Sequence, residues 1–356
     1  MNIPFSKLAM IVTLVVAHVV CNCETIPACR VAGLLDGPLD SSKKGNSSTL
    51  VKDSSDPQSV NPGKQDQPAQ GVTFSNPVSI KWKVNAKIRG GSGPAQNMLV
   101  TLPVPTAWPE QSVAIAEDDI PVSIARVKYR DLDSGVKQLV ALIPRIKPRE
   151  EITISMTFLV STSQINPPPD PSVFVRPKTN HRSGKPYIGV GPQINFRDSK
   201  LRKQVKEIVE DKPDIWSEIE AIYDWVRDNI EDNTAEPKDV VSVFRARAGC
   251  NEDKVGLFVA MCRAHKIPAR MVWVQGTQYA EFMLVDSEAN PHWFPCSVGG
   301  VREFGSMSDP RIVLQKGDSI RVPEKESRQK FVAEFATCTG KSKPSVKFDR
   351  QVLSVD

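Results

Sequence analysis

The chain has 356 residues and a net charge of +5, from 46 basic and 41 acidic residues. Its 40% apolar and 24% charged content is that of a globular protein, and its length allows two domains, each with its own core. Such a mild charge implies no nucleic-acid partner, which would normally show as a clustered basic face.

The N-terminus contains the clearest signal of cellular location. Lys7 precedes an apolar run over residues 8–20, which is shorter than the roughly 20 residues of a membrane-spanning helix. This pattern is typical of a secretory signal peptide, so we predict a signal over 1–23 and a secreted or periplasmic protein. Membrane association would then occur only through an uncleaved or lipidated N-terminus. Lipidation at Cys21 is disfavoured because His18, Val19 and Val20 are not the small residues expected before a lipidated cysteine.

Export permits disulfide bonds. Five cysteines remain after removal of the signal, an odd number that predicts at least one free thiol; a bond between Cys296 and Cys338 is left open as an alternative. The sequence has no CxxC pair and its four histidines are scattered. No metal site and no cofactor are therefore expected.

The next two segments differ in composition. Residues 24–70 are rich in Ser, Asp, Lys, Gly and Pro and contain few large apolar residues, which predicts a disordered leader. From residue 71 onward, apolar and polar residues alternate with the period of a half-buried strand. Five or more such segments predict a β-sandwich domain over 71–165, with a structural or recognition role. The strand-like segments are 78–88, 98–102, 122–129, 138–143 and 151–160.

A proline-rich linker over 166–186 marks the expected domain boundary. Beyond it, apolar residues recur at helical spacing over 201–209 and again over 215–230, where Asp214 is the expected N-cap. A further helix begins at Cys250 and presents Val255, Phe258, Val259 and Cys262 on one face. Strand patterns follow over 269–274, 279–285 and 292–296. The second domain is therefore predicted to be α+β.

Cys250 has the local setting of a nucleophile. It follows Gly249 and opens a helix, where exposed N–H groups and the helix dipole favour the thiolate. Catalysis by a thiol also needs a histidine to move protons and an acid to orient it. Glu252 and Asp253, within one turn, would instead raise the pKa of the thiol. A small buried cysteine at a helix start is the alternative interpretation.

Several motifs of the second domain resemble those of the transglutaminase-like superfamily, in particular a branch of secreted bacterial proteins. The resemblance extends from about residue 186 to 346, so the domain is expected over 187–346. It implies a papain-like fold in which Cys, His and Asp come from a helix start and two neighbouring strands. The motifs are Ala221-Ile-Tyr-Asp-Trp-Val-Arg-Asp-Asn, Gly249-Cys250, Leu257-Phe-Val-Ala-Met-Cys-Arg-Ala-His-Lys-Ile-Pro-Ala-Arg, Tyr279-Ala-Glu-Phe, Trp293-Phe-Pro-Cys, Glu303-Phe-Gly and Leu314-Gln-Lys-Gly-Asp.

Carried onto this sequence, the resemblance implies Cys250 as the nucleophile, with Thr277 in place of the histidine and Ser297 in place of the acid. A threonine hydroxyl cannot shuttle protons near neutral pH, a function worth roughly a hundred- to ten-thousandfold in rate. Neither of the nearby histidines is expected to replace the missing one. His292 is expected to lie far from Thr277 along its strand, and His265 far from Cys250 at the other end of the helix. The remaining candidates for the cleft are Gly249, Trp273, Tyr279, Glu281 and Trp293.

Two functions follow from these expectations. The favoured hypothesis is a weakly active or inactive transglutaminase-like protein that binds a peptide or a partner protein in the old cleft. The alternative is an active thiol acyltransferase, amidase or peptidase that acts on proteins or cell-wall peptides. A purely structural envelope or adhesion role for the sandwich is a third, weaker hypothesis.

Overall fold

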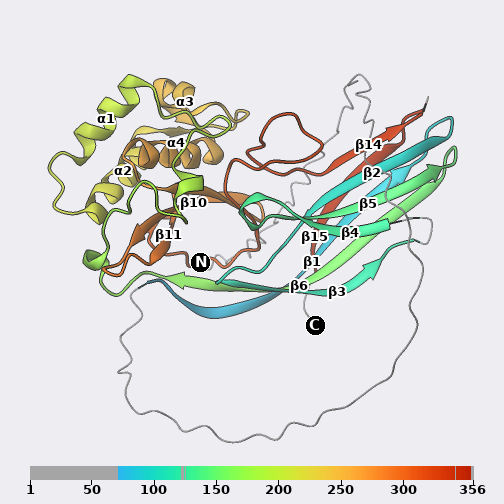
Figure 1. The fold of residues 1–356 in the computed structure, drawn as a ribbon, viewed down its shortest axis with the longest axis horizontal. Coiled ribbons are helices and arrows are strands. Elements are labelled where there is room, and N and C mark those ends of the chain that lie inside the picture. The colour runs from blue at the N-terminus through green and yellow to red at the C-terminus, as the bar shows by residue number, and fades with distance from the viewer. Residues whose placement is uncertain (1–70, 122–123, 125, 341, 354–356) are drawn as a thin grey trace, which may run out of the picture. The chain divides into compact units, whose positions relative to one another are not determined.

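The computed structural model describes residues 71–121, 124, 126–340 and 342–353 (Figure 1). The expected signal peptide and leader lie outside these residues. None of the helices in this described part of the chain is long and apolar enough to cross a membrane.

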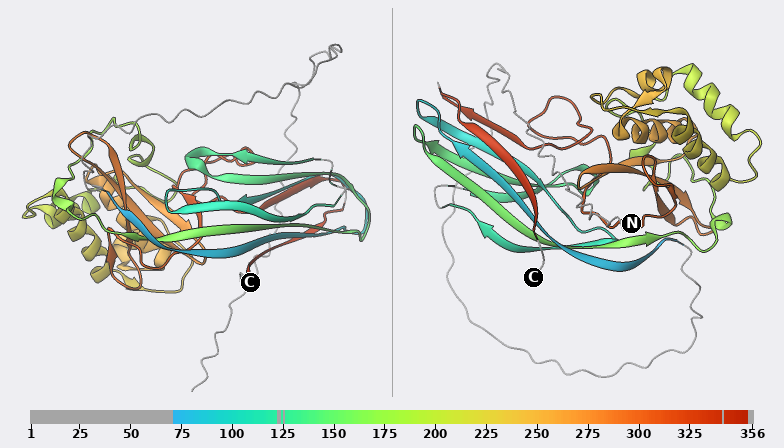
Figure 2. Two further views of the ribbon diagram at one scale, coloured as in Figure 1. Left: turned by 90° about the horizontal axis from the view of Figure 1, so that it is seen from below. Right: turned by 180° about the vertical axis from the view of Figure 1, so that it is seen from behind.

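Two antiparallel sheets share one hydrophobic core and form two layers (Figure 2). Inward-facing residues at every second position, such as Trp82, Val84 and Ala86 of one sheet and Met98 and Val100 of the other, are almost fully buried, as expected for packed sheets. The first sheet has the order β15 (Ser345–Leu353), β1 (Thr73–Arg89), β6 (Glu151–Asn166), β3 (Gln111–Asp119). The second has the order β14 (Phe335–Thr339), β2 (Ala95–Val104), β5 (Lys137–Ile146), β4 (Arg126–Asp131).

The last strands of the chain return to these two sheets. β14 pairs with β2, and β15 pairs with β1. The domain expected over 187–346 therefore extends too far, because from Phe335 onward the chain belongs to the sheets. The intervening residues form an insertion between β6 and β14.

The insertion contains a third antiparallel sheet with helices packed against it. Its strand order is β12 (Glu303–Phe304), β11 (Pro291–Ser297), β10 (Thr277–Val285), β9 (Ala269–Val274), β13 (Val313–Lys316). The helices are α1 (Ser199–Val209), α2 (Ile215–Asn229), α3 (Val240–Ala246) and α4 (Asn251–Ala264). A short parallel pair joins β7 (Glu231–Asp232) to β8 (Ala248–Gly249). Two single-turn 3-10 helices, η2 (Pro171–Val173) and η3 (Lys185–Tyr187), precede α1 in the insertion. A third, η1 (Asp133–Gly135), lies outside the insertion, between β4 and β5.

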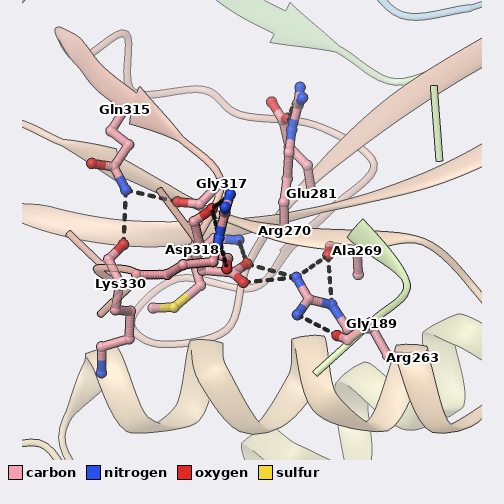
Figure 3. Close-up of polar contacts among 12 residues, drawn as sticks. Gly189, Arg263, Ala269, Arg270, Glu281, Gln315, Gly317, Asp318 and Lys330 are labelled. Atoms are coloured by element: carbon pink, nitrogen blue, oxygen red, sulfur yellow. Dashed lines mark hydrogen bonds and ion pairs between the residues drawn. The ribbon is translucent and has the colours of Figure 1, made fainter. Parts of the chain in front are cut away.

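Helix α4 lies against β9 and β10 and is buried along nearly its whole length. Near its C-terminus the guanidinium of Arg263 forms an ion pair with Asp318, and both side chains are almost inaccessible to solvent (Figure 3). Arg263 also donates hydrogen bonds to the carbonyl oxygens of Gly189 and Ala269. Two of the motifs quoted above therefore meet in a structural ion pair.

A second buried ion network joins the inserted sheet to the loop between β2 and β3. The guanidinium of Arg270 donates a hydrogen bond to a carboxylate oxygen of Glu281 at 2.7 Å. The ammonium of Lys316 lies 2.6 Å from a carboxylate oxygen of Glu281 and 2.6 Å from one of Glu110. The positive and negative charges balance, as buried charges require.

Candidate functional site

A cavity of about 420 Å³ opens beside the start of α4, the first residues of β10 and the last residue of β11. Residues from the end of β6 and from the loop before β3 also line it. The side chains that matter for its chemistry come from several elements. They are Glu110, Ile165, Asp232, Asn251, Val274, Thr277, Tyr279, Ser297, Val301, Glu303, Met307, Asp309, Arg311 and Val313.

Asn251, the first residue of α4, forms the polar floor of this cavity. Its side-chain amide donates hydrogen bonds to Thr277 Oγ1 at 3.0 Å and to the Gln278 carbonyl oxygen at 2.9 Å. Its other amide atom, Oδ1, lies so close to Gly299 that a Cβ there would clash with it. The helix start thus meets the neighbouring strands through an asparagine.

Cys250 is the N-cap residue of α4 and is not among the residues that line the cavity. Its backbone N–H donates to Asp253 Oδ2 at 3.1 Å. Burial raises the pKa of the thiol, and the charge of Asp253 adds to this effect, against the opposing influence of the Asp253 and Glu252 N–H groups. The residue of the helix start that hydrogen-bonds to Thr277 is thus Asn251, whereas the sequence had led us to expect Cys250 beside Thr277.

The sequence contained a signal for this one-residue difference. Asn251, Val255, Phe258 and Cys262 are separated by four, three and four residues and so lie on one face of the helix. Phe258 and Cys262 belong to the core that the helix shares with the sheet. Extending the apolar stripe back by one turn therefore leads to Asn251, whereas Cys250 lies on a neighbouring face.

Ser297 lines the cavity, as Thr277 does, and is the last residue of β11, where hydrogen bonds hold the strand end and the loop after it. Its hydroxyl donates to the Gly299 carbonyl oxygen at 2.7 Å. Helix α2 fixes the same backbone: Tyr223 donates to the Ser297 carbonyl oxygen, and Arg227 donates to the carbonyl oxygens of residues 297, 298 and 300. This wall of the cavity is therefore held in place by several hydrogen bonds.

Glu303 is a cavity residue that the sequence reasoning did not single out. It lies directly opposite Ser297 in the pairing of β11 with β12, so both side chains project from one face. Its Oε1 accepts hydrogen bonds from the backbone N–H and the hydroxyl of Ser308. The Glu303-Phe-Gly motif marked this residue, but only the strand pairing places it beside Ser297.

The remaining predicted cleft residues differ in position. Tyr279 lines the cavity, and burial raises the pKa of its hydroxyl well above its ordinary value. Gly249, Trp273, Glu281 and Trp293 do not line it. Trp273 packs against Phe331 with its ring tilted by 38°. The ring centroid of Trp293 lies 3.8 Å from the guanidinium carbon of Arg270, and Glu281 belongs to the ion network.

The histidines of the described residues have partners away from the cavity. His265 contacts Glu218 at 2.6 Å, and His292 contacts Asp286 at 2.9 Å. His292 pairs with Leu284 across the β10–β11 hairpin, seven residues along the strand from Thr277. Cys296 is a buried free thiol whose Sγ lies 3.6 Å from the Ala280 carbonyl oxygen, so the alternative bond to Cys338 is not formed.

Comparisons with known proteins agree with this arrangement of helices and sheet. Residues 202–299 match the family model described as "Transglutaminase-like superfamily". The crystal structure of a "Putative Cysteine Protease" from Cytophaga hutchinsonii is similar over 80% of this chain and 94% of that one, with a TM-score of 0.52 and 18% identity. A "putative protease" from Parabacteroides distasonis covers 67% of this chain and 48% of its own, with a TM-score of only 0.26 and 12% identity. No curated protein matches the sequence. The chain thus contains, over residues 202–299, a domain of the transglutaminase-like superfamily.

Proposed function

We propose that this protein is an exported transglutaminase-like protein that binds a peptide or a protein segment in its cavity without turning it over. One observation supports this most strongly. The helix start and the two strands that would provide a cysteine, a histidine and an acid bring together Asn251, Thr277 and Ser297.

These three side chains lack the chemistry of acyl transfer. An amide and two hydroxyls have no pKa near neutrality, so they can neither form a thiolate nor exchange a proton with a leaving amine. Cys250 does not replace them, since it does not line the cavity and its raised pKa leaves little thiolate at neutral pH.

Binding remains well supported. The volume of about 420 Å³ falls in the range of ligand sites, roughly 300–1,000 Å³. The lining includes the apolar side chains of Ile165, Val274 and Val313 besides the polar ones, and the exposed Val301 adds further apolar surface. Export is inferred from the N-terminal segment alone.

The first experiment measures turnover and binding on the same preparation. We expect neither hydrolysis of peptide amides nor incorporation of a labelled amine by the wild-type protein, and equal peptide binding by wild type and Cys250→Ala. Turnover by the wild type that disappears in Cys250→Ala would overturn the proposal and establish the thiol enzyme instead.

A second experiment locates the former nucleophile. Thr277→His combined with Ser297→Asp should remain inactive, although Cys250 is present. Adding Asn251→Cys to these two changes should produce a thiol that alkylates faster near neutral pH and hydrolyses an activated thioester or ester. Activity in the double variant that depends on Cys250 would contradict the assignment to Asn251.

A further inference from the structure

One carboxylate of the cavity differs from the others in its electrostatic surroundings. Glu110 contacts the ammonium of Lys316 at 2.6 Å, Asp232 that of Lys254 at 2.7 Å, and Asp309 the guanidinium of Arg311 at 2.7 Å. Glu303, which is half-buried, has no basic partner among the described residues; Ser308 supplies its only side-chain contacts.

Two arginines that contact the segments next to Glu303 have other partners. Arg302 forms ion pairs with Glu220 and Asp224 on the outer side of α2. Arg227 directs its guanidinium to backbone carbonyl oxygens of the loop. Both hydrogen bonds from Ser308 go to Oε1, so Oε2 of Glu303 has no hydrogen-bond partner within the part of the chain that the structure describes.

The charge of this half-buried carboxylate is thus not neutralised by a described side chain, which leaves it available to a cation from outside the protein. Here the carboxylate lines a cavity of ligand size and lies opposite Ser297, with Thr277 on the neighbouring strand. Those neighbours offer hydroxyls but no positive charge. The missing cation would therefore come from the ligand.

We propose that the cavity selects peptides with a positively charged side chain and that Glu303 Oε2 is the group that binds this charge. This inference rests on the proposed binding function and names its ligand class. A lysine ammonium suits the site better than a guanidinium fork, since a point charge needs only one free carboxylate oxygen. The apolar walls then contact the methylene chain of the same residue.

The test uses the full mature chain and blocked tetrapeptides that differ at one position, occupied by lysine, norleucine or glutamate. Dissociation constants are measured by calorimetry at low and high salt. We expect the lysine peptide to bind about fivefold more tightly than the norleucine peptide. This preference should shrink as salt is added, and the glutamate peptide should bind most weakly.

Variants identify the residue responsible. Glu303→Gln keeps an acceptor for Ser308 and should remove the lysine preference, so that the lysine and norleucine peptides bind equally well. Glu117→Gln, an exposed change of the same charge on β3, is the matched control and should retain the preference. Thermal melting checks that both variants are folded, and the salt series on the wild type tests the inference independently of any variant.

Each other outcome has a distinct meaning. Norleucine binding without a lysine preference, or a preference that survives in Glu303→Gln, would overturn this inference and leave the proposed binding function in place. If none of the peptides binds, both the inference and the proposed peptide-binding function fail.

Discussion

The ion pair between Arg263 and Asp318 provides the sharpest test of how the inserted domain is held together. Asp318→Asn removes the negative charge but keeps the size of the side chain. The Arg263 guanidinium would then stay buried with only uncharged acceptors, the carbonyl oxygens of Gly189 and Ala269 and the new amide oxygen. Met271 N–H would also lose its charged acceptor.

The magnitude follows from burial. The two side chains are only 2% and 1% exposed, and their two hydrogen bonds measure 2.9 and 2.7 Å. Removing one partner of such a pair costs about 3–5 kcal/mol. Asparagine still offers one acceptor oxygen, so we expect the lower end, about 3 kcal/mol. This is a large part of a typical folding free energy of about 5–15 kcal/mol.

The assay is urea unfolding followed by tryptophan fluorescence, with Asp224→Asn as the matched control. Asp224 also pairs with an arginine, Arg302, but these side chains are 41% and 49% exposed. Its loss should cost at most about 1 kcal/mol. If Asp318→Asn costs no more than Asp224→Asn, the reasoning from burial is refuted.

Other predictions concern the thiol, a hairpin carboxylate and a glycine. Burial raises the pKa of Cys250, so its alkylation should be slow at neutral pH and the rate should still increase above about pH 9. Peptide mass spectrometry measures the alkylation rate, and a rate that levels off near pH 7 would contradict this prediction. Although desolvation opposes it, hydrogen bonds within its hairpin lower the pKa of Asp286 to about 2. The ionised Asp286 therefore contributes its full stabilisation above the ordinary aspartate pKa of about 3.9, and this stabilisation is lost as pH falls through about 2. The difference in melting temperature between wild type and Asp286→Asn should shrink over that interval. Gly305→Ala should destabilise by more than about 1–3 kcal/mol, because φ is +72° and the new Cβ would lie 2.7 Å from an indole carbon. Gly276→Ala is the control, because φ there is +79° but no atom lies within 4 Å of the new Cβ. If both variants lose the same free energy of unfolding in urea, the clash at Gly305 does not contribute.

Local patterns were predicted well where a helix is both capped and amphipathic. Asp214 is the N-cap of α2, and its side chain accepts a hydrogen bond from Ser217 N–H at 2.8 Å, as expected. Ile219, Ile222 and Val226 of the predicted stripe are fully or almost fully buried. These features depend on neighbours within one or two turns, so the sequence specifies them directly.

Features that depend on distant partners were predicted less well. The short helix α3 (Val240–Ala246) and the strand β3 (Gln111–Asp119) were not anticipated, since neither has a long periodic pattern. Strands β14 and β15 were missed as part of the sandwich sheets because nothing in a strand's own sequence identifies the strand beside it. Their partners lie more than 200 residues earlier in the chain.

The sequence by itself determined the superfamily, the two kinds of structure in the chain, and the presence of Thr277 and Ser297 where a histidine and an acid are expected. Only the tertiary structure decided which residue at the start of α4 meets them. A shift of one residue rotates a side chain by about 100° around a helix, which is enough to take Cys250 off the cavity and bring Asn251 to its floor. The same holds for Glu303, whose place beside Ser297 arises from strand pairing that no local pattern encodes.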